Sequence, residues 1–94
     1  MRAADRDAVG PVLERVPLGE AVAAAIRELH PDAEVLDRGA YLRVSVPRRC
    51  HVTREAIERH AGTAVLLPRD LERVMSSFKG RFRVTEEEAS WVLE

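Results

Sequence analysis

Two hydrophobic periods follow each other in the first half of the chain, and this change most limits what the chain can fold into. Apolar residues recur at positions 18, 22, 25, 26 and 29, the spacing of one face of an amphipathic helix. Pro31 ends this predicted helix, because the residue before a proline is kept out of the α conformation. Over residues 40–46 the pattern alternates strictly, with apolar residues at 42, 44 and 46 and polar ones between them, as in a half-buried strand.

The remaining segments extend this mixed pattern. Strands are predicted at residues 34–37, 50–52, 81–84 and 90–93, and the Gly-Pro within Val9-Gly10-Pro11-Val12-Leu13 favours an extended edge segment. Thr53 suits the N-cap of a helix through residue 60, with Gly62 as its stop. Pro68 suits the first position of a third helix, whose apolar stripe lies at 71, 74, 75 and 78. The sequence therefore predicts one small α+β domain of order β-α-β-β-α-α-β-β, a mostly antiparallel sheet packed on helices.

Length and charge narrow the function classes. Ninety-four residues make one domain with a modest core, and we expect a mobile N-terminal tail over residues 1–8 before a domain over 9–94. A formal charge of −1, with the two signs balanced in each half of the chain, argues against a nucleic-acid partner. A single cysteine, no secretory leader and no long apolar run predict a cytoplasmic protein without a membrane partner.

The residues that usually carry catalysis do not form a recognisable site. Cys50 and His51 are adjacent on a predicted strand, so their side chains point to opposite faces and cannot form a thiolate–imidazole pair there. His30, His51 and His60 lack the spacing of a metal-ligand motif, and no glycine-rich phosphate loop occurs. The sequence predicts no enzyme activity, no metal and no cofactor, and favours a binding role.

Three short motifs, in this order, carry a resemblance to a known family. They are Val9-Gly10-Pro11-Val12-Leu13, then Asp37-Arg38-Gly39-Ala40-Tyr41-Leu42-Arg43-Val44, then Ser76-Ser77-Phe78-Lys79-Gly80-Arg81. Together they resemble the effector, or coupling, proteins of soluble diiron monooxygenases, and the similarity runs from about residue 9 to residue 93. The short segment before Val9 is closer to the toluene or aromatic-type group than to the methane-type members. Ala8 stands where an Asn is frequent in the toluene-type proteins, which removes one expected polar contact.

The resemblance implies a cofactor-free regulatory protein that is not itself an enzyme. Such a protein binds the diiron hydroxylase component of an NADH-dependent monooxygenase, reshapes its active site and couples NADH oxidation and O2 activation to substrate hydroxylation. It implies these hydroxylase-binding residues: Val9, Gly10, Pro11, Tyr41, Arg43, Met75, Ser76, Ser77, Phe78, Lys79, Gly80 and Arg81. We expect the free protein to be a monomer, and Trp91 to lie in the core.

Two other classes are compatible with the residues alone. An α+β module that senses a small molecule or binds an unrelated protein would need a convergent polar pocket. A small cysteine-dependent enzyme would need an activated thiol at Cys50.

Overall fold

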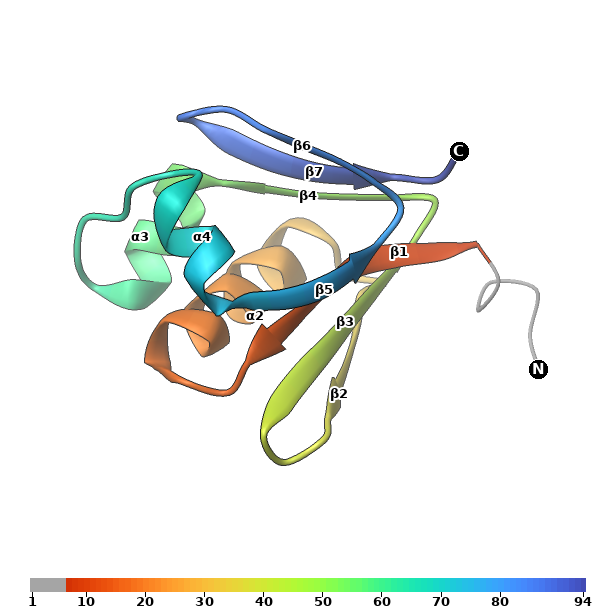
Figure 1. Ribbon diagram of the computed structural model, residues 1–94, viewed down its shortest axis with the longest axis horizontal. Coiled ribbons are helices and arrows are strands. Elements are labelled where there is room, and N and C mark those ends of the chain that lie inside the picture. Colours follow the sequence, from red (N-terminus) through yellow and green to blue (C-terminus); the bar gives the residue numbers. More distant parts are fainter. Residues whose placement is uncertain (1–6) are drawn as a thin grey trace.

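The computed structural model describes residues 7–94 and contains two antiparallel sheets and three helices (Figure 1). The elements, in chain order, are β1 (Ala8–Glu14), α2 (Pro17–Leu29), β2 (Glu34–Asp37), β3 (Tyr41–Pro47), β4 (Arg49–Thr53), α3 (Arg54–Ala61), α4 (Arg69–Val74), β5 (Met75–Lys79), β6 (Arg81–Val84) and β7 (Glu88–Val92). The predicted α+β class, with antiparallel strands packed on helices, is confirmed. The mobility predicted for residues 1–8 falls mostly on residues 1–6, which lie outside the described residues.

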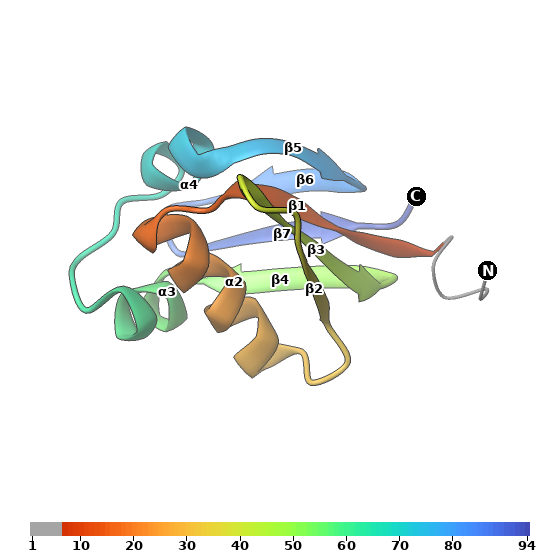
Figure 2. The same ribbon diagram turned by 90° about the horizontal axis from the view of Figure 1, so that it is seen from below.

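The strands divide into a four-stranded sheet of order β2-β3-β1-β5 and a three-stranded sheet of order β4-β7-β6. Figure 1 shows the three-stranded sheet above the four-stranded one. Seen from below in Figure 2, the four-stranded sheet lies in front and the three-stranded sheet behind it. In both views α3 and α4 lie at one end of the molecule. The outer faces of the two sheets therefore point in opposite directions.

The core fills the space between these layers. Helix α2 contributes Val22 and Ile26, the four-stranded sheet contributes Leu13, and the three-stranded sheet contributes Val52 and Trp91, all at most 1% exposed. These positions follow the helical and alternating patterns of the sequence, because the apolar face of each element turns inward. Trp91 is confirmed as a core residue.

Strand β1 lies in the middle of its sheet, between β3 and β5, so the prediction of an edge segment is wrong. Proline normally avoids interior strands because it has no N–H for the ladder. Here the pairing of β1 with β3 passes from Val9 to Val12 without pairs at Gly10 and Pro11. The local interruption of this ladder lets Pro11 occupy an interior strand, where it is fully buried.

The third helix is shorter than predicted, since α4 ends at Val74 and Met75–Lys79 forms β5. The helical stripe at 71, 74, 75 and 78 was therefore misleading beyond Val74. Pairing with β1 satisfies backbone groups on the second side of that strand, and such tertiary pairing overrides a weak local preference. Pro68 is the N-cap residue of α4 and does not occupy its first helical position.

The termini of α3 agree with the sequence. The Thr53 hydroxyl accepts a hydrogen bond from the Ala56 N–H at 3.1 Å, and Gly62 follows the helix in the left-handed conformation with φ of 73°. Both groups satisfy backbone atoms that a helix leaves unpaired at its ends. This capping fixes α3 directly after β4, against α2.

Candidate functional site

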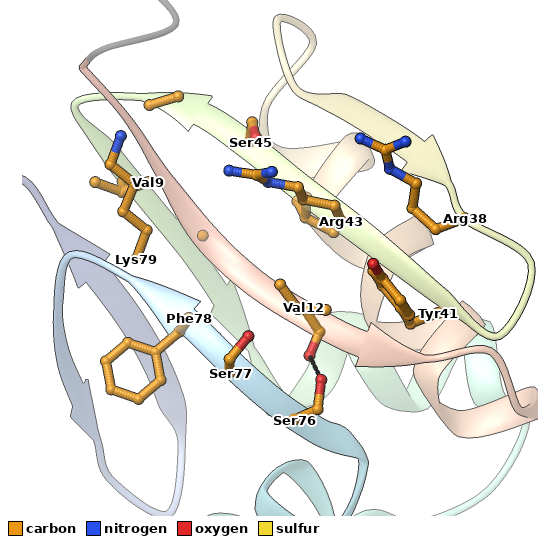
Figure 3. Close-up of a pocket in the computed structure, with 13 residues that line it drawn as sticks. Val9, Val12, Arg38, Tyr41, Arg43, Ser45, Ser76, Ser77, Phe78 and Lys79 are labelled. Atoms are coloured by element: carbon orange, nitrogen blue, oxygen red, sulfur yellow. Dashed lines mark hydrogen bonds between the residues drawn. The ribbon is translucent and has the colours of Figure 1, made fainter.

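The outer face of the four-stranded sheet contains a hollow of about 410 Å³ (Figure 3). Its lining comes from β1, β3, β5 and the turn between β2 and β3. The lining residues are Ala8, Val9, Gly10, Val12, Arg38, Tyr41, Arg43, Val44, Ser45, Ser76, Ser77, Phe78 and Lys79.

Strand register builds the centre of this face from one residue of each strand. Leu36 of β2 lies opposite Arg43 of β3, and Arg43 lies opposite Val12 of β1. Val12 in turn lies opposite Ser77 of β5. Directly opposed residues of paired strands share a face, so these four form one row across the sheet.

Many of the residues implied by the resemblance meet at this hollow, although they come from three separate motifs. The group comprises Val9, Gly10, Tyr41, Arg43, Ser76, Ser77, Phe78 and Lys79. Strand alternation places Tyr41 and Arg43 on the outward face, while Leu42 and Val44 between and beyond them are buried. Val9 contributes to the lining only from below, because it is 1% exposed.

Gly10 forms part of the floor of the hollow and accepts no larger residue without distortion. Its φ of 147° lies in a region that L side chains rarely adopt, and an added Cβ would stand 2.5 Å from the Val44 carbonyl oxygen. Glycine therefore allows β1 to approach β3 closely at this point.

A bulge lets two consecutive serines face the hollow. Val12 pairs with Ser77 but Leu13 pairs with Met75, so Ser76 is an extra residue in β5. Adjacent residues of a regular strand point to opposite faces, whereas a bulge redirects one of them. Figure 3 shows both hydroxyls on the same side of the strand, with Ser76 Oγ donating to the Val12 carbonyl oxygen at 3.4 Å.

Phe78 sits at the border of the hollow and its ring turns away from it (Figure 3). The ring centroid lies 5.3 Å from that of Phe82, which stacks on Trp91 at 5.4 Å. Phe78 is nevertheless 48% exposed. The Phe78 ring is thus the outer member of a row of three aromatic rings that ends in the core at Trp91. The remainder of the Phe78 side chain is open to solvent.

The other implied residues lie outside the hollow. Pro11 is buried, and Met75 packs against the core. Gly80 makes the turn from β5 to β6, where an added Cβ would lie 2.9 Å from Val9 Cγ1. Arg81 belongs to β6 in the second sheet and forms an ion pair with Glu94 at 3.5 Å.

Five lining residues are not among those that the resemblance implies: Ala8, Val12, Arg38, Val44 and Ser45. Strand alternation alone is enough to predict that Ser45 belongs to this site, because it shares a strand face with Tyr41 and Arg43. Arg38 was part of the second motif but stands in a turn, where periodicity gives no direction for its side chain.

The residues considered for catalysis do not form a reactive centre. The Cys50 side chain is fully buried, and burial raises the pKa of its thiol to about 12, which disfavours the nucleophilic thiolate. The backbone N–H of His51 donates to His30 Nε2 at 2.9 Å, so the His30 ring is a structural acceptor. In residues 7–94 no group of three or more His, Cys, Asp or Glu side chains is arranged to hold a metal ion, and no helix there is long and apolar enough to cross a membrane.

Comparison with known proteins connects this fold to a family. The model of the MmoB/DmpM family matches residues 7–92. The chain belongs to the MmoB/DmpM family. A relative in Xanthobacter autotrophicus (strain ATCC BAA-1158 / Py2), the effector subunit of an alkene monooxygenase system, is 38% identical over 89 residues, which cover 93% of this chain and 87% of the relative.

Solved structures share the fold of this MmoB/DmpM member. A chain of the phenol hydroxylase–regulatory protein complex superimposes with a TM-score of 0.80 at 20% identity, over 93% of this chain and 98% of that one. The soluble methane monooxygenase regulatory protein B gives 0.69 at 20% identity, over 94% of this chain and 66% of that one.

Proposed function

We propose that this MmoB/DmpM member is the effector protein of a multicomponent diiron monooxygenase and docks on the hydroxylase through the outer face of β1, β3 and β5. The observation that carries the proposal is the convergence of three separate sequence motifs on one hollow. Family membership and the 38% identical effector subunit support the role.

The mechanism is one of linked equilibria and not of bond chemistry on this chain. An effector that binds one hydroxylase conformation better than another shifts the equilibrium between them by its difference in affinity. The chain itself contributes shape, charge and the exposed aromatic rings of Tyr41 and Phe78. NADH oxidation and O2 activation take place on the partner components, and this protein couples them to substrate hydroxylation.

The size of the chain suits a transient partner of this kind. A standard protein interface buries about 800 Å² on each side, and the whole chain exposes 5708 Å², so one sheet face is sufficient. The effector would work as a cytoplasmic monomer beside NADH-dependent components, and its free, buried Cys50 is consistent with a reducing compartment. The proposed substrate of the partner is an alkene or a small aromatic compound, on the resemblance and the identity of the relative.

The decisive experiment adds this protein to its cognate hydroxylase, reductase components, substrate and NADH, and follows product and NADH together. We expect turnover and the product formed per NADH to rise and to saturate near one effector per active site. No change in either quantity, with no complex on a sizing column, would contradict the proposed role.

Phe78→Ala tests the β5 border of the hollow in the same assay. Losing the Phe82 ring contact costs about 1 kcal/mol beyond the apolar area that the ring buries. Because Phe78 is 48% exposed, we expect the variant to fold and its product per NADH to fall well below wild type. Leu66→Ala is a matched control, because Leu66 is 56% exposed but lies between α3 and α4, outside the hollow. Equal coupling by the two variants would argue against docking through β5.

A further inference from the structure

The hollow has an unusual charge pattern for this chain. Among residues 7–94, the hollow is lined by Arg38, Arg43 and Lys79 and by no carboxylate, although the whole chain carries 15 basic and 16 acidic side chains. Figure 3 shows the three cationic side chains spread over one face, with Arg43 extending from β3 toward β1. Positive charge is therefore gathered on this part of the described surface.

The two arginines of the hollow also differ from most others in the structure. Arg15, Arg54 and Arg59 each lie within ion-pair distance of a carboxylate. Within residues 7–94, neither Arg38 nor Arg43 has a side-chain hydrogen bond or an ion pair. Both residues are exposed, so water can satisfy their guanidinium groups.

Docking on this face would remove that solvent. Desolvating a charge without giving it a partner is strongly unfavourable, so a surface that covers Arg43 must bring its own anions. A guanidinium binds a carboxylate through two parallel hydrogen bonds. The Ser77 hydroxyl stands at the opposite wall and can donate to the same group.

We propose that the hollow captures carboxylate side chains, Asp or Glu, that project from the hydroxylase surface, with Arg43 as the central anchor. This inference rests on the proposed function and adds the chemistry of the partner segment. Arg43 stands between Leu36 and Val12 in the row across the sheet, so the matching segment carries apolar residues beside its carboxylate. The net charge of −1 of the whole chain disfavours the phosphate backbone of a nucleic acid as the ligand of the hollow.

The first test is the affinity of Arg43→Gln for the cognate hydroxylase, measured by titration calorimetry. Loss of a desolvated charge pair predicts a Kd at least about thirtyfold weaker. Arg43→Lys restores only part of the affinity, because an ammonium cannot bind a carboxylate in the bidentate geometry. The matched control is Arg83→Gln on β6 of the other sheet, and we expect it to change the Kd less than about threefold.

The second test identifies the carboxylate directly. Lys79 is the only lysine of the chain and lines the hollow. A carbodiimide activates a carboxylate and joins it to a nearby amine as an amide without a spacer. Peptide mapping of the treated complex is expected to find Lys79 Nζ joined to an Asp or Glu of the hydroxylase. Lys79→Arg keeps the charge and loses this product.

Several outcomes overturn the inference and are distinguishable. If Arg43→Gln binds like wild type while Phe78→Ala lowers coupling, the face docks the hydroxylase without carboxylate capture, and the proposed function survives. If Lys79 is joined only to a carboxylate of its own chain, the hollow is filled from within. Tight binding of a short DNA duplex that Arg43→Gln abolishes would assign the hollow to phosphate. Failure of the wild-type protein to bind the hydroxylase overturns both the inference and the proposed function.

Discussion

At the scale of single residues, the hollow depends on Gly10. Its backbone conformation and its contact with β3 are separate constraints, because the first concerns φ and the second concerns space beside the Val44 carbonyl. Gly39 shares only the first constraint: its φ is 85°, and an added Cβ would meet nothing within 4 Å. The two glycines therefore form a natural pair for separating strain from crowding.

Gly10→Ala is expected to lower the free energy of unfolding by about 3 kcal/mol, because backbone strain and a steric clash add at this site. Gly39→Ala should cost about 1 kcal/mol, from strain alone. Urea denaturation of both variants measures the difference. Equal losses for the two would show that β1 can move away from β3 at no cost.

At the scale of elements, the sequence could predict those that alternation, periodicity or capping specify. It anticipated α2, β3 and the ends of α3, because each depends on its own residues: the stripe from 18 to 29, the alternation from 40 to 46, and Thr53 with Gly62. It failed at Met75–Lys79, where pairing with β1 decides the conformation. The two serines face one hollow only because of a bulge, and a bulge is set by the partner strand and has no local signal here.

Side-chain hydrogen bonds join helix α2 to helix α3. Glu28 of α2 accepts from Arg59 and lies 2.8 Å from His60 Nε2, both residues of α3. These hydrogen bonds, first that of His60 and then that of Arg59, hold the pKa of the Glu28 carboxyl below its usual 4.5. A lowered folded-state pKa contributes stability that is present above the unfolded pKa and is lost as pH falls through the folded pKa.

Glu28→Gln is therefore expected to melt at a lower temperature than wild type near pH 6, with the difference shrinking as pH falls below about 4.5. Thermal melts from pH 2 to pH 7 provide the measurement. Glu72→Gln on α4 is the control, because in residues 7–94 the Glu72 side chain has neither an ion pair nor a hydrogen bond. A Glu28→Gln deficit that stays constant down to pH 2 would mean that the carboxylate charge does not hold the helices together.

At the scale of the whole molecule, the two sheets give the protein two outer faces that point in opposite directions (Figures 1 and 2). Within residues 7–94, the four-stranded sheet carries the hollow, which is lined by three basic residues and no acidic one. The shallow depression on the other sheet, beside Arg49 and Arg83, includes Glu88. A partner that docks on the hollow covers one face of the protein. We therefore expect docking to reduce the solvent access of one sheet and not of the other.

This difference can be measured by comparing backbone hydrogen exchange in the free protein and in its complex with the cognate hydroxylase. Exchange reports local opening and solvent access, and β5 lies at an edge of its sheet with one side unpaired. Exchange should slow most in β5 and the turn between β2 and β3, less in β1, and remain unchanged in β4, β6 and β7. Protection confined to β4, β6 and β7 would place the hydroxylase on the other face and remove Arg43 from the interface. Protection of both sheets alike would indicate global stabilisation, and Arg43→Gln would then reduce it everywhere by the same factor as its loss of affinity.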